Sequence, residues 1–291
     1  MNPLKNFFIT YRKKIVICGI ALFALHIMLW SQILFQKSGD KDLRVYFLNV
    51  GQGDATLALL PHGVKLLIDG GPPNGRLLRE LEKILPATDR YIDLMMMSHP
   101  QLDHFGGFVE LLRRYRVGAL LTTGRAGEVS AFYDLEKAIA ENNVRVIHVA
   151  RGDTLRYGES VGEIMNPNET FLKSKALNDT SLVMKLTSAH TTALFTADIG
   201  ANIENMLRAV GFVDILKVPH HGSRFSSSAS FLNAISPKVA VIEVGKNSYG
   251  HPTSQALERI EESGAKIYRT DKDGTVEIVS DGNTLKVFKN L

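Results

Sequence analysis

One short stretch of the chain has the residue types of a metal-binding loop. Residues 98–107 read Ser-His-Pro-Gln-Leu-Asp-His-Phe-Gly-Gly, so His99 and His104 offer imidazole nitrogens and Asp103 offers a carboxylate. Imidazole with carboxylate suits zinc, manganese or iron, and the absence of cysteine nearby argues against a thiolate-rich structural zinc site. Because Asp103 and His104 are adjacent, we expect irregular backbone that lets both reach one ion. Taken alone, the pattern also fits a polar surface loop.

Further polar residues follow three apolar runs that read as strands. They are Asp198, the pair His220-His221 with Ser223 close behind, and His251. Each lies where a predicted strand ends, so all of them can meet at one edge of a rigid scaffold. A single histidine at a strand end is usually a surface residue, but repetition over several loops favours an assembled site. The sequence therefore predicts a metal site built from distant segments.

The segments between these residues alternate as a two-layer α/β domain requires. A meander of antiparallel strands is predicted over residues 43–68 and ends at Asp69. Leucine spacing predicts a helix over 75–85, an apolar run predicts a strand over 91–98, and a helix is expected over 108–115. The second half repeats this order. The predicted fold class is α/β, with two mixed sheets packed face to face and helices outside.

An apolar segment precedes this domain. Residues 15–35 carry no charged side chain, and about 20 apolar residues suffice to cross a bilayer. A cleaved signal peptide is the alternative, but no small-x-small site follows the run. We expect a basic cytoplasmic N-terminus over 1–14, a single-pass transmembrane anchor over 15–35, a linker over 36–42 and the α/β domain over 43–291. The lysine and arginine bias places that domain outside the cytoplasm.

The charge balance argues against a generally basic DNA-binding domain. The net charge of +4 comes from four basic residues before residue 37, and the rest of the chain holds 30 basic and 30 acidic residues. A polyanion would therefore be bound through a local patch or through metal ions. The single cysteine, Cys18, allows no disulfide within the chain. That is neutral on compartment, because a domain of about 250 residues is stable without one.

Together the motifs resemble the metallo-β-lactamase fold. In chain order they are Asp69-Gly-Gly, His99-x-x-x-Asp103-His104, Asp198, His220-His221-Gly-Ser and Gly-His251-Pro. More narrowly, residues 47–55, 216–223 and 269–274 resemble the extracellular hydrolase domain of ComEC-type competence proteins. The resemblance covers nearly all of residues 43–280. It implies an αββα sandwich that holds one or two divalent metal ions, with manganese or zinc as the expected ions.

Carried over to this chain, the resemblance implies a set of ligands. They are His99 for one ion, Asp103 and His104 for the other, Asp198 as the bridging carboxylate, and one of His220 and His221. The sequence leaves open which of the last pair is the ligand. We assign His220 to the metal, and we assign His221 to catalysis together with Asp198 and His251.

Four further residues are expected around the ligands. Asp69 would orient the ligands. Ser223 lies where it could meet an anionic oxygen of the substrate, although simple capping is the favoured role for it. Gln101 and Asn178 stand where the family commonly has histidines. These departures reduce the number of ligands at the His99 site, so binding of a single ion, or of a weak second ion, is expected.

The implied activity is a phosphodiesterase or nuclease that acts on DNA outside the cytoplasm, alongside a separate DNA-uptake channel protein. A bound metal ion would lower the pKa of its water to about 7 and so supply a hydroxide for attack on phosphorus. One alternative is a hydrolase of a cell-envelope phosphodiester or phosphorylcholine ester. Another is a metal-binding module with little turnover, which Gln101 and Asn178 motivate.

Overall fold

The computed structural model describes residues 3–38 and 41–290, and the chain divides into two units, residues 1–41 and 42–291. The first unit contains one long helix, α1 (Pro3–Ser38). The side chains of residues 29 and 31–35, which belong to the predicted anchor, lie outside the described part. Among the described residues, none of the helices combines the length and hydropathy that crossing a membrane requires. This finding does not support the transmembrane helix predicted over residues 15–35, which stays a prediction from sequence.

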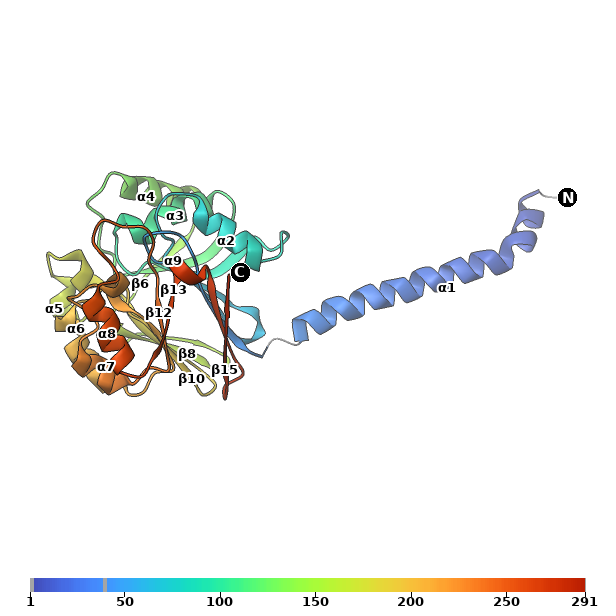
Figure 1. The fold of residues 1–291 in the computed structure, drawn as a ribbon. Coiled ribbons are helices and arrows are strands. Elements are labelled where there is room, and N and C mark those ends of the chain that lie inside the picture. The colour runs from blue at the N-terminus through green and yellow to red at the C-terminus, as the bar shows by residue number, and fades with distance from the viewer. Residues whose placement is uncertain (1–2, 39–40, 291) are drawn as a thin grey trace. The chain divides into compact units, whose positions relative to one another are not determined.

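The second unit contains two sheets (Figure 1). In the described residues the first sheet has the strand order β15-β14-β1-β2-β3-β4-β5-β6, and the second has the order β13-β12-β11-β10-β9-β8-β7. The strands of the first sheet are β1 (Leu43–Phe47), β2 (Thr56–Leu59), β3 (Lys65–Ile68), β4 (Tyr91–Met96), β5 (Arg116–Thr122), β6 (Arg145–His148), β14 (Val276–Ser280) and β15 (Leu285–Lys289). Those of the second are β7 (Thr154–Tyr157), β8 (Ser160–Asn166), β9 (Val183–Ser188), β10 (Thr191–Phe195), β11 (Ile215–Lys217), β12 (Val239–Ile242) and β13 (Lys266–Arg269).

Helices cover the outer face of each sheet. They are α2 (Arg76–Ile84), α3 (Leu102–Leu112), α4 (Ala131–Glu141), α5 (Glu169–Leu172), α6 (Ala201–Leu207), α7 (Ala229–Ile235), α8 (Ser254–Glu262) and α9 (Thr270–Asp273). Short 3₁₀ turns lie at η1 (Pro61–Gly63), η2 (Leu177–Thr180), η3 (Arg208–Val210) and η4 (Pro219–Gly222). Figure 1 shows α2, α3 and α4 together on one side of the sheets and α6, α7 and α8 on the other.

Three apolar clusters hold these layers together. The first packs α2, α3 and α4 on the first sheet through residues such as Leu77 and Phe105. The second lies between the sheets, where the rings of Phe47 and Phe195 are 6.4 Å apart. The third packs α6, α7 and α8 on the second sheet and includes Phe231. The two-sheet architecture with outer helices is therefore confirmed, as is the antiparallel pairing of β1, β2 and β3.

Helix α3 begins earlier than the sequence pattern indicated. We expected irregular backbone up to residue 107, but Asp103 and His104 lie in the first turn of α3. The prediction was wrong because the helix was expected to begin only at residue 108, after the glycine pair at 106 and 107. Both glycines instead allow close packing inside the helix, since a Cβ on Gly107 would lie 2.1 Å from the carbonyl oxygen of Gly70.

Candidate metal centre

The site lies at the carboxyl ends of strands from both sheets. Strands β3 and β4 run parallel in one sheet, and β10, β11 and β12 run parallel in the other. The segment after each of these strands carries a polar residue of the site, and these residues are Asp69, His99, Asp198, His221 and Glu243. Ligands of α/β proteins commonly bind outside the carboxyl ends of strands. The fold therefore brings together residues that are up to 174 positions apart in the sequence.

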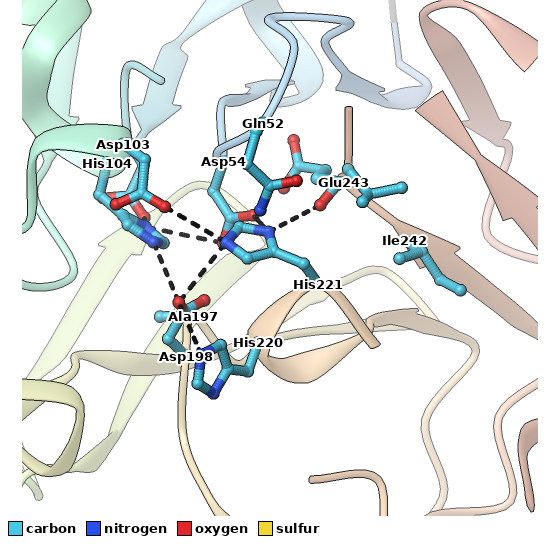
Figure 2. A network of polar contacts seen from close by, with 12 residues as sticks. Gln52, Asp54, Asp103, His104, Ala197, Asp198, His220, His221, Ile242 and Glu243 are labelled. Atoms are coloured by element: carbon cyan, nitrogen blue, oxygen red, sulfur yellow. Dashed lines mark hydrogen bonds and ion pairs between the residues drawn. The ribbon is translucent and has the colours of Figure 1, made fainter. Parts of the chain in front are cut away.

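Four side chains from three segments converge there (Figure 2). His104 Nε2 lies 3.4 Å from Asp198 Oδ2, and His221 Nε2 lies 3.5 Å from the same oxygen. His221 Nε2 also lies 3.5 Å from Asp103 Oδ2. Two imidazole nitrogens and two carboxylate oxygens thus face one another, which is a donor set suited to zinc or manganese.

The buried atoms of this group also fit a metal ion. Within the described residues, Nε2 of His104 and Nε2 of His221 are buried and have no hydrogen-bond partner. Buried polar atoms are nearly always satisfied, so several orphaned atoms at one point indicate a missing partner. His99 Nε2 is a further orphan, and His99, His104 and Asp198 also have ligand atoms within 4.8 Å of one another.

The rings of His104 and His221 are each held by a contact at Nδ1, on the side opposite Nε2. His104 Nδ1 lies 2.8 Å from Asp69 Oδ2, and Asp69 is itself held by the Ser98 N–H (2.8 Å) and the Ser98 hydroxyl (2.6 Å), which donate to its two oxygens. His221 Nδ1 lies 2.8 Å from the backbone carbonyl of Glu243. A proton on each Nδ1 satisfies these contacts and leaves Nε2 free to bind a metal. The structure thus places Asp69 where an orienting role was predicted.

The backbone of the site adopts uncommon conformations. The φ angles of Asp69, Ala197, His220 and His221 are 57°, 49°, 50° and 53°, in the left-handed region that side-chain-bearing residues rarely adopt. Such positions persist only where the surroundings hold them, and they concentrate at functional sites. In η4 they turn His221 inward, so that its side chain is 3% exposed while that of His220 is 31% exposed.

The site concentrates negative charge. Burial lowers the pKa of His221, but the carboxylates of Asp198 and Asp54 outweigh burial and raise it to about 10. Burial likewise opposes ionisation of Asp198, but His221 and His104 hold its pKa well below the usual range. Carboxylates that force buried imidazoles to take up protons create a strong preference for positive charge. A divalent cation supplies that charge without protonating the ligands.

The two members of the histidine pair have different surroundings. His220 Nε2 is 3.8 Å from Asp198 Oδ2, and its ring faces His251 at a centroid distance of 5.5 Å. Its partial exposure and this orientation place it on the wall of the site. His221 is buried and has its Nε2 among the other ligand atoms. The structure therefore favours His221 as the ligand and His220, with His251, as residues that face the substrate.

A cavity of about 450 Å³ opens over these atoms. Gln101 and Asn178 lie in its wall, where the Gln101 side-chain N–H donates to Asn178 Oδ1 at 2.8 Å. Asp198, His220, His251 and Tyr249 also line it. Ser223 is buried instead, and its hydroxyl accepts a hydrogen bond from the Phe225 N–H within its own turn. Ser223 is not among the described residues that line the cavity, so its position favours a structural role.

Three buried polar residues of the site were missed in the sequence. Asp54 and Lys217 form an ion pair, and the Glu243 carboxylate accepts hydrogen bonds from the Ala55 N–H and the Thr56 hydroxyl. Lys217 and Glu243 were hidden in apolar strands, and Asp54 was read as part of a turn. A charged residue at the end of a fully buried strand is a signal that could have identified Lys217 and Glu243.

Comparison with known proteins gives one family for this fold and site. A sequence model of the metallo-beta-lactamase superfamily matches residues 48–245. The chain is 28% identical over 283 residues to ComE operon protein 3 of Bacillus subtilis, which covers 90% of this chain and 35% of that protein. It is 29% identical over 245 residues to competence protein ComA of Neisseria gonorrhoeae, which covers 82% of this chain and 32% of that protein.

The chain thus spans about a third of the length of the curated relatives it matches. Among solved structures, the metallo-beta-lactamase fold protein YhfI of Bacillus subtilis superposes with a TM-score of 0.59 at 13% identity, over 81% of this chain and all of that one. At that identity the likeness concerns the fold alone. The resemblance to competence proteins that the sequence motifs indicated is confirmed.

Proposed function

The chain belongs to the metallo-beta-lactamase superfamily, and from this premise we propose that it is a metal-dependent phosphodiesterase that cleaves DNA. The observation that carries the proposal is the convergence of Asp103, His104, Asp198 and His221 at an open cavity, which Asp103, Asp198 and His221 line. These four residues would hold the ion. When bound, a divalent cation supplies Lewis acidity towards a phosphoryl oxygen and an activated water.

Asp198, His220 and His251 have separate roles at the site. Asp198 presents Oδ2 to both ligand histidines, so it fixes their mutual position. Burial lowers the pKa of His220 and of His251, so both rings are neutral near pH 7. A neutral imidazole carries one N–H, which can donate a hydrogen bond to a phosphoryl oxygen. Because both rings line the cavity, they are placed to steady the charge that develops on the phosphoryl group.

An exposed aromatic ring favours a nucleic acid over other phosphodiesters. Tyr249 is 73% exposed, lines the cavity, and stacks on His251 at a centroid distance of 5.8 Å and an interplanar angle of 30°. Nucleobases stack on such rings with a free energy of about 1–3 kcal/mol each. The name of one curated relative, competence protein ComA, points in the same direction.

The proposal is tested with the full chain, Mn²⁺, labelled single- and double-stranded DNA, and bis(p-nitrophenyl) phosphate. We expect cleavage of DNA that EDTA and Asp103→Ala abolish. Tyr249→Ala should slow DNA cleavage about 10-fold, the effect of losing one stacked base, and leave hydrolysis of the small ester unchanged. Retained cleavage in Asp103→Ala would contradict the assignment of this site.

Two other activities remain distinguishable in the same assay. Hydrolysis of bis(p-nitrophenyl) phosphate without cleavage of DNA would favour a cell-envelope phosphodiester or phosphorylcholine ester as substrate. Metal binding without hydrolysis of DNA or of the small ester would favour a binding module. The Gln101–Asn178 amide pair, which stands where the family commonly has histidines, is the reason to consider it.

The membrane anchor over 15–35, the location of the domain outside the cytoplasm and a partnership with a DNA-uptake channel belong to this proposal. They rest on the sequence of the first unit and on the names of the relatives. Protease treatment of intact cells tests the location, since the domain should then be digested from outside.

A further inference from the structure

A buried ammonium group lies beneath the candidate metal centre. Lys217 ends strand β11 and is only 2% exposed. Its Nζ pairs with Asp54 Oδ2, donates a hydrogen bond to the Ala197 carbonyl at 3.0 Å, and lies 3.8 Å from Asp198 Oδ1. A lysine buried to this extent requires compensating negative charge, and these partners supply it.

The same position has the ligands of an ion site. Asp54, Asp198 and His221 have ligand atoms within 4.8 Å of one another. Two of these three residues are the carboxylates that face the Lys217 ammonium. The third, His221, presents its Nδ1 to Asp54 Oδ1 at 3.2 Å. The ammonium therefore stands where oxygen ligands would otherwise attract a cation.

The two oxygens of Asp198 face different groups. Oδ2 faces His104 and His221, and Oδ1 faces Lys217. Asp54 is fixed as well, because its N–H donates to the Asp103 carbonyl at 3.2 Å and its own carbonyl accepts from the Gly71 N–H at 2.7 Å. Lys217 therefore contacts Asp198 directly and is linked to His221 through Asp54.

We propose that the Lys217 ammonium is a built-in cation that takes the place of a metal ion between Asp54 and Asp198. Because the ammonium occupies the position between Asp54 and Asp198, an ion that Asp198 and His221 share is bound only together with Asp103 and His104. The inference goes beyond the proposed function, because it makes no assumption about substrate or turnover. It also explains why this lysine is kept in the core despite the cost of burying its charge.

The test uses full-length Lys217→Ala, with measurement of melting temperature and of metal content by elemental analysis after dialysis against Mn²⁺. Without metal, the melting temperature should fall by about 10 °C, because two buried carboxylates lose their partner. With Mn²⁺ it should recover, and the variant should retain one more ion per chain than the wild type. Lys238→Ala is the matched control, since Lys238 forms a surface ion pair with Asp214 and should change neither quantity.

A second variant keeps the inference testable if Lys217→Ala does not fold without metal. Asp54→Asn with Lys217→Met removes both charges at similar volume, so it should keep the ion content of the wild type and be more stable than either single variant. The inference is overturned if Lys217→Ala holds no additional ion and gains no more stability from Mn²⁺ than the wild type does. It is also overturned if the double variant is the least stable of the set.

Discussion

At the scale of single residues, Asp69 joins the strand scaffold to a ligand. Its two oxygens accept hydrogen bonds from Ser98, and Oδ2 also meets His104 Nδ1 at 2.8 Å. In Asp69→Asn an amide N–H can face His104 Nδ1, which disturbs the tautomer that leaves Nε2 free. We expect a 10–100-fold loss of Mn²⁺ affinity, an order-of-magnitude figure, measured by competition with a fluorescent chelator. Asp214→Asn, which changes a partly buried carboxylate that pairs with Lys238, is the control, and equal affinity in both variants would refute the role of Asp69.

Glu243 gives the protein a pH-dependent stability. Burial, with the nearby Asp54 carboxylate, raises the pKa of Glu243 from 4.5 to about 8. Between these values the folded state holds a proton that the unfolded state releases, so this contribution is present below pH 4.5 and is lost as the pH rises to 8. Relative to Glu243→Gln, the wild type should lose a few kcal/mol of unfolding free energy over that window, at about 1.4 kcal/mol per pKa unit. Urea titrations with EDTA at several pH values measure this difference, and parallel curves would contradict it.

At the scale of elements, the site depends on close contact between the β1–β2 loop and α3. Gly53 has a φ of 141°, and a Cβ there would lie 2.2 Å from the Asp103 carbonyl oxygen. Gly53→Ala should therefore displace the turn that carries Asp103 and lower both stability and metal affinity. Gly63→Ala is the matched control, because Gly63 also has a positive φ of 90° but has open space where the Cβ would be. Thermal melts and Mn²⁺ titration compare the two, and an equal loss in both would mean that backbone strain alone is responsible.

The elements were largely predictable because their signals are local. Apolar runs marked β3, β4 and β10, and leucine spacing marked α2. The start of α3 was not, because the glycines that suit its packing against the Gly70 backbone look like helix breakers in the sequence. Packing between distant segments decides such cases, and periodicity carries no information about it.

The candidate ligands could be picked out for a different reason. A histidine or aspartate at a strand end is visible in the sequence, so His99, Asp103, His104 and Asp198 could be found. The choice of His221 over His220 depends on left-handed backbone and on the Glu243 carbonyl, which lies on another strand segment. The position of Lys217 at the end of a buried strand is visible in the sequence, but its pairing with Asp54, 163 positions earlier in the chain, is not.

At the scale of the whole domain, two sheets bring their strand ends to one edge, and the ligands come from both. Asp103 and His104 follow the first sheet, whereas Asp198 and His221 follow strands of the second. An ion bound by all four therefore links the two layers. Since a ligand that binds only the folded state stabilises it, Mn²⁺ should raise the melting temperature of the wild type, and this rise should depend on ligands from each sheet.

The most direct test of the account is the metal content of three full-length proteins after dialysis against Mn²⁺ and then buffer. The wild type and His220→Ala should retain at least one ion per chain, because His220 lies on the cavity wall. His221→Ala should lose its ion, because direct ligation is worth at least the roughly 10–100-fold in affinity of an orienting contact. Retention by His221→Ala together with loss from His220→Ala, or retention of no ion by the wild type, would contradict the account.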